Sequence, residues 1–260
     1  MVPFFDYVFY RSPKKYRILQ NLGGIGNLTA IPAAATPNQV IAFDTGPANM
    51  VIDACMEQLF DKRYDRSGAI AAKGMVLDKV VNQVLRDSFF RRKPPKTAGR
   101  EQFGREFVSL FLALCGKTPK ENVIATATAL TARSIATAVR ALPGLLLPLS
   151  LSSNSLLPLP LPPAPLESGS LPKPKMTGEY IVAGGGSRNK TLMTMLEDEL
   201  QPLGFRIRHS DEFGMPSQAK EAAAFALLAY QSWHRLPSNI LSATGADKQA
   251  ILGKISYPPL

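Results

Sequence analysis

The sequence predicts an α/β protein, and three observations lead to this class. Short apolar runs of strand character fill residues 17–44, and longer segments with apolar residues at helical spacing follow them. Two apolar runs end in glycine-containing turns, at Asp44-Thr-Gly-Pro47 and at Gly184-Gly-Gly186. Glycine permits close backbone approach, and free N–H groups at a helix start attract anions, so the two turns indicate one nucleotide held at both ends.

Composition limits the possible partners. The chain has 260 residues, of which 45% are hydrophobic, enough to build the core of one large domain or two small ones. Lys and Arg outnumber Asp and Glu by 30 to 20, but the basic residues are scattered. The one dense run, Arg91-Arg-Lys93 with Lys96, has no interleaved aromatics. We therefore expect no nucleic-acid partner.

Cysteine usage and the apolar segments bear on location. Cys55 and Cys115 are far apart and lie among apolar helical positions, which predicts buried free thiols in a reducing compartment and excludes a structural zinc site. Residues 1–6 lack the features of a signal peptide, and prolines interrupt the apolar stretch 145–166. We expect a cytoplasmic protein that does not enter a membrane.

The helices and strands of the first half are predicted from the spacing of apolar residues and from glycine and proline turns. Residues 1–16 read as an irregular lead-in, and residues 17–44 as antiparallel strands separated by a glycine turn and a Pro-Asn turn. A helix should begin near Pro47, since proline is favoured at the first helical position. Helical spacing of apolar residues predicts further helices, at about 75–89, 101–114 and 119–141.

The second half begins with a change of composition. Residues 143–178 are mostly Leu, Pro and Ser, which predicts a disordered insertion in a loop, with an unspliced intron read as protein as the alternative. The remaining sequence, 17–142 with 179–260, is expected to form one lobe. Its expected later elements are two strands and two helices, at about 180–183, 189–201, 205–208 and 217–233.

The first glycine turn has two readings. Thr and Asp can cap an ordinary strand-to-helix turn, which would need no ligand. The functional reading places the Gly46 amide and the Thr45 hydroxyl on phosphate oxygens, with Asp44 near Mg²⁺ through water.

The second turn favours a ligand more strongly, because three successive glycines cost conformational entropy where one would make a turn. Two other segments stay open. Lys96-Thr-Ala-Gly-Arg-Glu101 reads either as a helix start or as a ligand loop, and Glu221, among alanines, is either solvated or a ligand group. His209 and His234 have no partner at a catalytic spacing.

Seven motifs, each weak alone, occur in the order typical of one family, the anhydro-N-acetylmuramic acid kinases, which the chain resembles over about residues 17–258. They are Asn21-Leu-Gly-Gly-Ile-Gly-Asn27-Leu-Thr29, Ala42-Phe-Asp-Thr-Gly-Pro-Ala-Asn49, Pro94-Pro-Lys-Thr-Ala-Gly-Arg-Glu101, Ala127-Thr-Ala-Leu-Thr-Ala132, Gly184-Gly-Gly-Ser-Arg-Asn189, Lys220-Glu-Ala-Ala-Ala-Phe-Ala226 and Ser242-Ala-Thr-Gly-Ala246. The resemblance implies one lobe of a two-lobe kinase of the actin and hexokinase type, with a mixed five-stranded ribonuclease-H-like sheet. It implies ATP-dependent opening of the 1,6-anhydro ring by water with phosphorylation of the 6-oxygen.

The resemblance also assigns roles to residues, with ATP and Mg²⁺ as cofactors and a homodimer as the plausible assembly. The residues implied for nucleotide and phosphate are Asp44, Thr45, Gly46, Asn49, Gly184, Gly185, Gly186 and Asn189. Those implied for the sugar are Asn21, Asn27 and Glu221, and Asp44 is the candidate for Mg²⁺ through water.

The chain departs from the family pattern in one respect. Members carry a Gly-Thr-Ser-x-Asp phosphate loop, a His-Gly-Gln segment and a catalytic aspartate that activates water, and none of these motifs occurs in this sequence. Two main hypotheses therefore stand: an ATP-dependent anhydro-N-acetylmuramic acid kinase, of which this chain supplies the nucleotide side, and a catalytically inactive ATP-binding or dimerising remnant. A third hypothesis, a nucleic-acid binder, rests on the formal charge of +10 alone. No catalytic residue is assigned in this chain.

Overall fold

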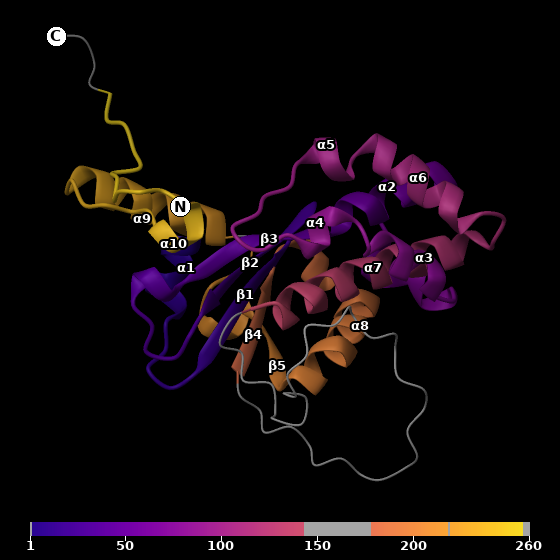
Figure 1. Cartoon of the computed structure of the whole chain (residues 1–260), viewed down its shortest axis with the longest axis horizontal. Helices are drawn as coiled ribbons and strands as arrows, with labels where there is room; N and C mark the ends of the chain where they lie inside the picture. Colours follow the sequence, from indigo (N-terminus) through magenta and orange to yellow (C-terminus); the bar gives the residue numbers. More distant parts are fainter. Residues whose placement is uncertain (1, 143–177, 218, 257–260) are drawn as a thin grey trace.

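A computed structural model describes residues 2–142, 178–217 and 219–256, and its centre is a five-stranded mixed sheet (Figure 1). The strands are β1 (Tyr16–Leu22), β2 (Ile25–Ile31), β3 (Ile41–Pro47), β4 (Gly178–Ala183) and β5 (Phe205–His209). Their order in the sheet is β3-β2-β1-β4-β5. The pairs β1–β2 and β2–β3 are antiparallel, whereas β1–β4 and β4–β5 are parallel. The predicted α/β class with a mixed five-stranded, ribonuclease-H-like sheet is confirmed.

Ten α-helices in the described ranges accompany the sheet. They are α1 (Val2–Tyr10), α2 (Asn49–Phe60), α3 (Asp78–Val84), α4 (Ser88–Arg91), α5 (Arg100–Phe103), α6 (Arg105–Cys115), α7 (Lys120–Arg140), α8 (Lys190–Leu200), α9 (Lys220–Trp233) and α10 (Leu241–Thr244). Short 3-10 turns join several of them, among them Arg66–Gly68 and Gly185–Arg188.

Strand alternation gives the sheet two buried faces. On one face Ile18 and Tyr180 pack in a core with helices α7 and α8. On the other face Leu19 and Ile181 pack in a core with α1, α9 and α10 (Figure 1). Neighbouring strand residues point to opposite faces, so β1 and β4, which lie side by side in the interior of the sheet, bury residues on both faces.

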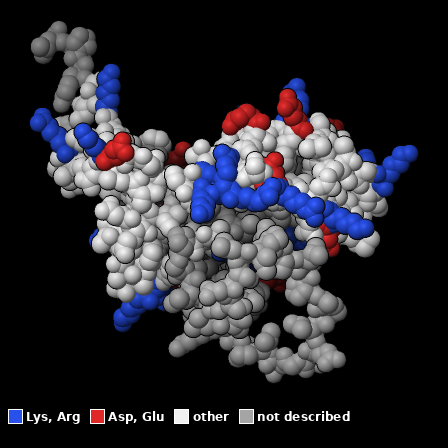
Figure 2. Space-filling model, viewed as in Figure 1, with Lys and Arg blue, Asp and Glu red and all other residues white. Residues whose placement is uncertain are grey.

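Helices α2 to α7 form a third core beside the sheet, around residues such as Val51, Phe89 and Phe111. Helix α7 also buries threonines. Thr126 and Thr128 donate hydrogen bonds of 2.6 and 2.9 Å to backbone carbonyls one turn earlier, which satisfies their hydroxyls inside the core. On the face seen in Figure 2, Lys and Arg side chains form a band across this helical part, with acidic side chains beside it.

Four local expectations were wrong, one of them the helix at 101–114, which is divided at Gly104 into α5 and α6. The expected irregular lead-in contains helix α1, whose buried aromatic residues pack on the sheet. The predicted helix 75–89 is two helices, α3 and α4, because Asp87 caps a new helix by accepting a hydrogen bond of 2.8 Å from the Phe89 N–H. The predicted turn at 44–47 is the end of β3, which pairs with β2 as far as Pro47.

Other expectations concern thiols, membranes and the insertion. Cys55 and Cys115 are buried free thiols as predicted, and burial raises the pKa of Cys55 to about 12. In the part of the chain that the structure describes, no helix has both the length and the apolar character needed to span a bilayer. The predicted insertion lies outside the described residues, apart from Gly178, which begins β4.

Candidate functional site

The candidate site lies where the parallel strands β1 and β4 end. Asn21 at the end of β1 is opposite Ala183 at the end of β4. From this edge the chain leaves β1 toward β2 on one side of the sheet, while β5 lies on the other side of β4. Such a switch point at the carboxyl ends of strands is where open α/β sheets bind ligands.

The turn between β1 and β2 forms one side of this edge. Its carbonyl groups hold the start of α2: the Ala48 N–H donates to the Gly24 carbonyl at 3.0 Å, and the Asn49 N–H to the Gly23 carbonyl at 2.9 Å. The Asn49 side chain adds a hydrogen bond of 3.0 Å to the Leu22 carbonyl. Helix α2 is thereby fixed against the glycine turn of the first motif.

The turn after β4 explains why three glycines occur together. Gly184 has φ +89°, and a Cβ there would lie 2.6 Å from the Asn21 side-chain oxygen. A Cβ on Gly186 would lie 2.8 Å from Leu22 Cβ and 2.9 Å from the Asn49 side-chain oxygen. Gly185 is different, because a Cβ there would have Asn49 Nδ2 as its nearest neighbour, at 3.8 Å. Packing therefore accounts for two glycines, and the third leaves cavity space open.

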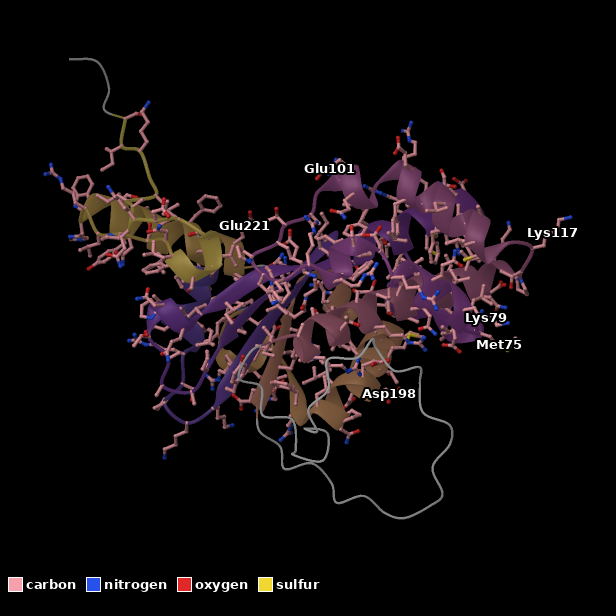
Figure 3. All side chains as sticks on the ribbon, viewed as in Figure 1. Met75, Lys79, Glu101, Lys117, Asp198 and Glu221 are labelled. Carbon is pink, nitrogen blue, oxygen red and sulfur yellow. The ribbon has the colours of Figure 1, made fainter. Side chains whose placement is uncertain are left out.

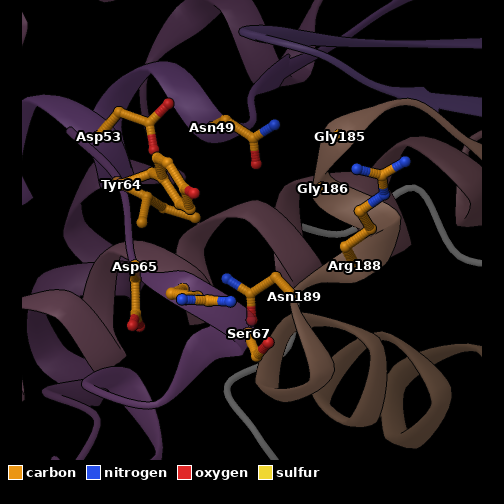
Figure 4. A pocket seen from close by; sticks show the side chains of 11 residues that line it. Asn49, Asp53, Tyr64, Asp65, Ser67, Gly185, Gly186, Arg188 and Asn189 are labelled. Atoms are coloured by element: carbon orange, nitrogen blue, oxygen red, sulfur yellow. The ribbon is translucent and has the colours of Figure 1, made fainter. Parts of the chain in front are cut away.

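The first cavity, of about 540 Å³, lies between α2, the loop 64–67 and this glycine turn (Figure 4). Figure 4 shows Asp53 and Tyr64 side by side on one wall and Arg188 on the opposite side, with Asn49 between them. The lining residues are Asn49, Ile52, Asp53, Tyr64, Asp65, Arg66, Ser67, Gly185, Gly186, Arg188 and Asn189.

Two carboxylates line this cavity, and they differ in their hydrogen bonds to the rest of the protein. Asp65 accepts the backbone N–H groups of Ile70 and Ala71, both at 2.9 Å, and so holds its own loop. Asp53 has no hydrogen bond or ion pair to any residue in the described ranges, and burial raises its pKa to about 6. Of these two carboxylates, Asp53 is therefore the one available to a ligand.

The second cavity, of about 440 Å³, lies on the other side of the glycine turn, against α9. Asn21 and Asn27 are cross-strand partners at the β1–β2 turn, and Glu221 is an exposed residue in the first turn of α9 (Figure 3). The lining residues are Val2, Asn21, Asn27, Gly184, Gly185, Arg188, Ser217, Lys220, Glu221 and Ala224.

A buried ion pair fixes α9 beside this cavity. The Lys220 ammonium lies 2.7 Å from the Asp6 carboxylate, which is only 1% exposed. Asp6 also accepts a hydrogen bond of 2.8 Å from the Thr29 hydroxyl on β2. The charge of Lys220 is thus neutralised by Asp6 of helix α1. The neighbouring Glu221 carboxylate has no hydrogen bond or ion pair with the residues described.

The structure brings most of the sequence-predicted residues to the two cavities. Asn49, Gly185, Gly186 and Asn189 line the first; Asn21, Asn27, Gly184, Gly185 and Glu221 line the second. Asn189 also accepts a hydrogen bond of 3.0 Å from the Leu192 N–H and so caps α8.

Asp44, Thr45 and Gly46 line neither cavity. Thr45 is 1% exposed, and a Cβ on Gly46 would lie 2.8 Å from the ring of Phe90. One Asp44 oxygen accepts the Ala98 N–H at 2.8 Å, and burial raises the pKa of Asp44 against the effect of that bond. The phosphate and Mg²⁺ roles of these three residues stay predictions.

Sequence reasoning missed several lining residues. Asp53 lies one turn into α2, at a position that the apolar spacing of the helix does not assign to the core or to a ligand. Residues 64–67 belong to a loop, where the sequence has no apolar periodicity. Arg188 lies inside the glycine motif and lines both cavities, although the motif alone assigns it no role. A charged residue directly after a predicted glycine turn is the sequence signal that could have identified Arg188.

The fold and site define an α/β protein of the ribonuclease-H-like type, with two neighbouring cavities at the carboxyl ends of its parallel strands β1 and β4. The sequence model of the family described as "Anhydro-N-acetylmuramic acid kinase" matches residues 1–145 and 170–258. The chain belongs to the anhydro-N-acetylmuramic acid kinase family.

Curated relatives agree with this membership. The chain is 41% identical over 260 residues to the anhydro-N-acetylmuramic acid kinase of Bacillus cereus strain Q1, covering 100% of this chain and 61% of the relative. It is 42% identical over 259 residues to that of Bacillus cereus strain ATCC 14579, covering 100% of this chain and 59% of the relative. The chain thus spans about three fifths of the length of these relatives.

Among solved structures, two are similar at low identity. One is the activator of the 2-hydroxyisocaproyl-CoA dehydratase from Clostridium difficile with bound ADPNP, with 10% identity, 84% of this chain and 60% of that chain covered, and a TM-score of 0.39. The other is component A of the Acidaminococcus fermentans (R)-2-hydroxyglutaryl-CoA dehydratase, with 14% identity, 86% and 68% covered, and a TM-score of 0.39.

Proposed function

We propose that this chain supplies nucleotide and sugar contacts of an ATP-dependent kinase that acts on 1,6-anhydro-N-acetylmuramic acid. Water opens the anhydro ring and the 6-oxygen receives the γ-phosphate, giving N-acetylmuramic acid 6-phosphate. The observation that carries the proposal is that two cavities, each lined by several polar side chains, share one glycine turn. A kinase must bring two substrates together at one boundary, so paired cavities suit this reaction.

The first cavity suits the nucleotide. Its volume of about 540 Å³ is within the range of small-molecule sites. Tyr64, which is 60% exposed, offers a ring face to a base, and the Asp53 carboxylate offers acceptors to the ribose hydroxyls. Gly185 leaves room for a ligand beside the backbone.

The second cavity suits the sugar. The side-chain amides of Asn21 and Asn27 can donate and accept, and Glu221 can accept, so the three match a ligand rich in hydroxyl and amide groups. The Asp6–Lys220 ion pair holds the helix that carries Glu221. We propose Glu221 as a sugar-binding residue.

Mg²⁺ would enter with the nucleotide. The described residues hold no group of three or more His, Cys, Asp or Glu side chains that could bind a metal ion, and Mg²⁺ commonly relies on substrate phosphates and water with one or two carboxylates. Asp44 has one oxygen without a hydrogen bond in the described part, which suits a contact through water. We also propose a cytoplasmic location, and a homodimer on the resemblance alone.

The assay is ADP release with anhydro-N-acetylmuramic acid, preceded by calorimetric binding of Mg·ATP. We expect ATP binding by this chain and turnover only when the segment with the water-activating aspartate is supplied. Glu221→Gln should weaken sugar binding about tenfold with nucleotide affinity unchanged, and Glu57→Gln, an exposed residue outside both cavities, is the control. A wild-type chain that binds no nucleotide would refute the proposal.

A further inference from the structure

Arg188 occupies a position that no other charged side chain in the described ranges shares. It lines the first and the second cavity, and the only other described residue that does so is Gly185, which has no side chain. Figure 4 shows the guanidinium on the side of the first cavity where Gly185 and Gly186 lie. Arg188 therefore stands at the boundary between the two spaces.

The backbone that carries Arg188 is firmly held. The Ser187 hydroxyl donates to the Gly184 carbonyl at 2.8 Å, and the Asn189 N–H donates to the Gly186 carbonyl at 3.0 Å. The side chain itself is exposed and makes no hydrogen bond or ion pair with the residues described. A fixed backbone with an uncommitted guanidinium is suited to receive a ligand.

The neighbouring cations do not compete for this role. Lys220 in the second cavity is paired with buried Asp6 at 2.7 Å. Arg66 lines the first cavity alone, on the loop across from the glycine turn. Arg188 is thus the available positive charge that both cavities share.

We propose that Arg188 binds the β- and γ-phosphates of the nucleotide and holds the γ-phosphate at the opening to the sugar cavity. The inference rests on the proposed function, since it takes the first cavity as the nucleotide site. A planar guanidinium can donate two parallel hydrogen bonds to phosphate oxygens, which fixes orientation as well as charge. Because Arg188 lines both cavities, its guanidinium can contact a phosphate at the boundary between them.

The test compares ATP, ADP and AMP in calorimetric titrations of wild-type chain, Arg188→Met and Lys190→Met, all with Mg²⁺. Lys190 is exposed, lies two residues away and lines neither cavity, so its variant removes the same charge from the same region. We expect Arg188→Met to weaken ATP and ADP about tenfold or more and to leave AMP unchanged. Arg188→Lys should recover part of the loss, and Lys190→Met should lose less than threefold.

The outcomes separate the two proposals. Wild-type binding with unchanged ATP affinity in Arg188→Met would overturn the role of Arg188 and leave the nucleotide site standing. An equal loss for AMP and ATP would also overturn it, because the side chain would then act on the nucleoside or on the turn. Absence of all nucleotide binding in the wild type would overturn the proposed function and this inference together. Melting temperatures of the variants check that each is folded.

Discussion

Replacing Gly184 by alanine should destabilise the fold through the backbone. Gly184 has φ +89° and ψ 174°, a region that residues with a Cβ rarely enter. The added Cβ would lie 2.6 Å from the Asn21 side-chain oxygen and 2.9 Å from the Leu22 carbonyl oxygen. The asparagine can rotate away, but the carbonyl belongs to β1 and cannot move without disturbing the sheet.

We expect Gly184→Ala to cost about 2 kcal/mol and to lower the melting temperature by roughly 4–8 °C. Thermal unfolding followed by circular dichroism measures this, with Gly185→Ala as the matched control. A Cβ on Gly185 meets only Asn49 Nδ2, at 3.8 Å, and its φ is not in the positive range, so its melting temperature should stay near the wild type. Equal melting temperatures for the two variants would refute the packing explanation of the triple glycine.

Three further predictions concern buried charged groups. Burial raises the pKa of Asp53 in the folded state to about 6, from an ordinary 3.8, so the stability that its neutral form contributes is lost as pH rises through 6. Asp53→Asn should therefore have a higher melting temperature than the wild type near pH 8, and the difference should vanish near pH 4. Asp6→Ala leaves Lys220 without its partner and should cost about 3 kcal/mol in urea unfolding, whereas an unchanged midpoint would contradict the ion pair's role. Lys96, 6% exposed, donates to two backbone carbonyls of α4, so Lys96→Met should lower stability by about 1–3 kcal/mol, and the exposed Lys93→Met should not.

The strands were predictable because their signals are local. Glycine turns and apolar runs placed β1, β2 and β3, and the run before the triple glycine placed β4 to within two residues. Helix α7 was predicted almost to its ends, since apolar and small residues at helical spacing continue over its whole length. Periodicity works where one element buries one continuous face.

The failures have tertiary causes. Helix α1 consists largely of aromatic and β-branched residues, which favour strands in isolation, and it is helical because it packs on the sheet beside α9. The predicted turn at 44–47 is instead the end of β3, and Gly46 packs so closely that a Cβ there would meet Phe90 and Ser134, a contact between distant segments that sequence spacing does not reveal.

The candidate site was predictable in part for the same reason. Asn21, Asn49 and the triple glycine belong to motifs at strand ends, where ligands are expected, and they do line the cavities. Asp53 and Tyr64 reach the first cavity only because α2 and the following loop fold back toward the start of α8, where the Thr191 hydroxyl donates to the Gly68 carbonyl at 2.7 Å. A contact across such a sequence separation leaves no local pattern.

The central claim is that the space beside Gly185 is where the nucleotide lies. Calorimetric titration of Mg·ATP into the wild-type chain and into Gly185→Ala tests it directly, because the added methyl group enters the boundary of both cavities without a packing clash. The account predicts one bound ATP per wild-type chain and an affinity about tenfold lower in a variant that melts at the wild-type temperature. Equal affinity in both proteins, or no binding to the wild type, would contradict it.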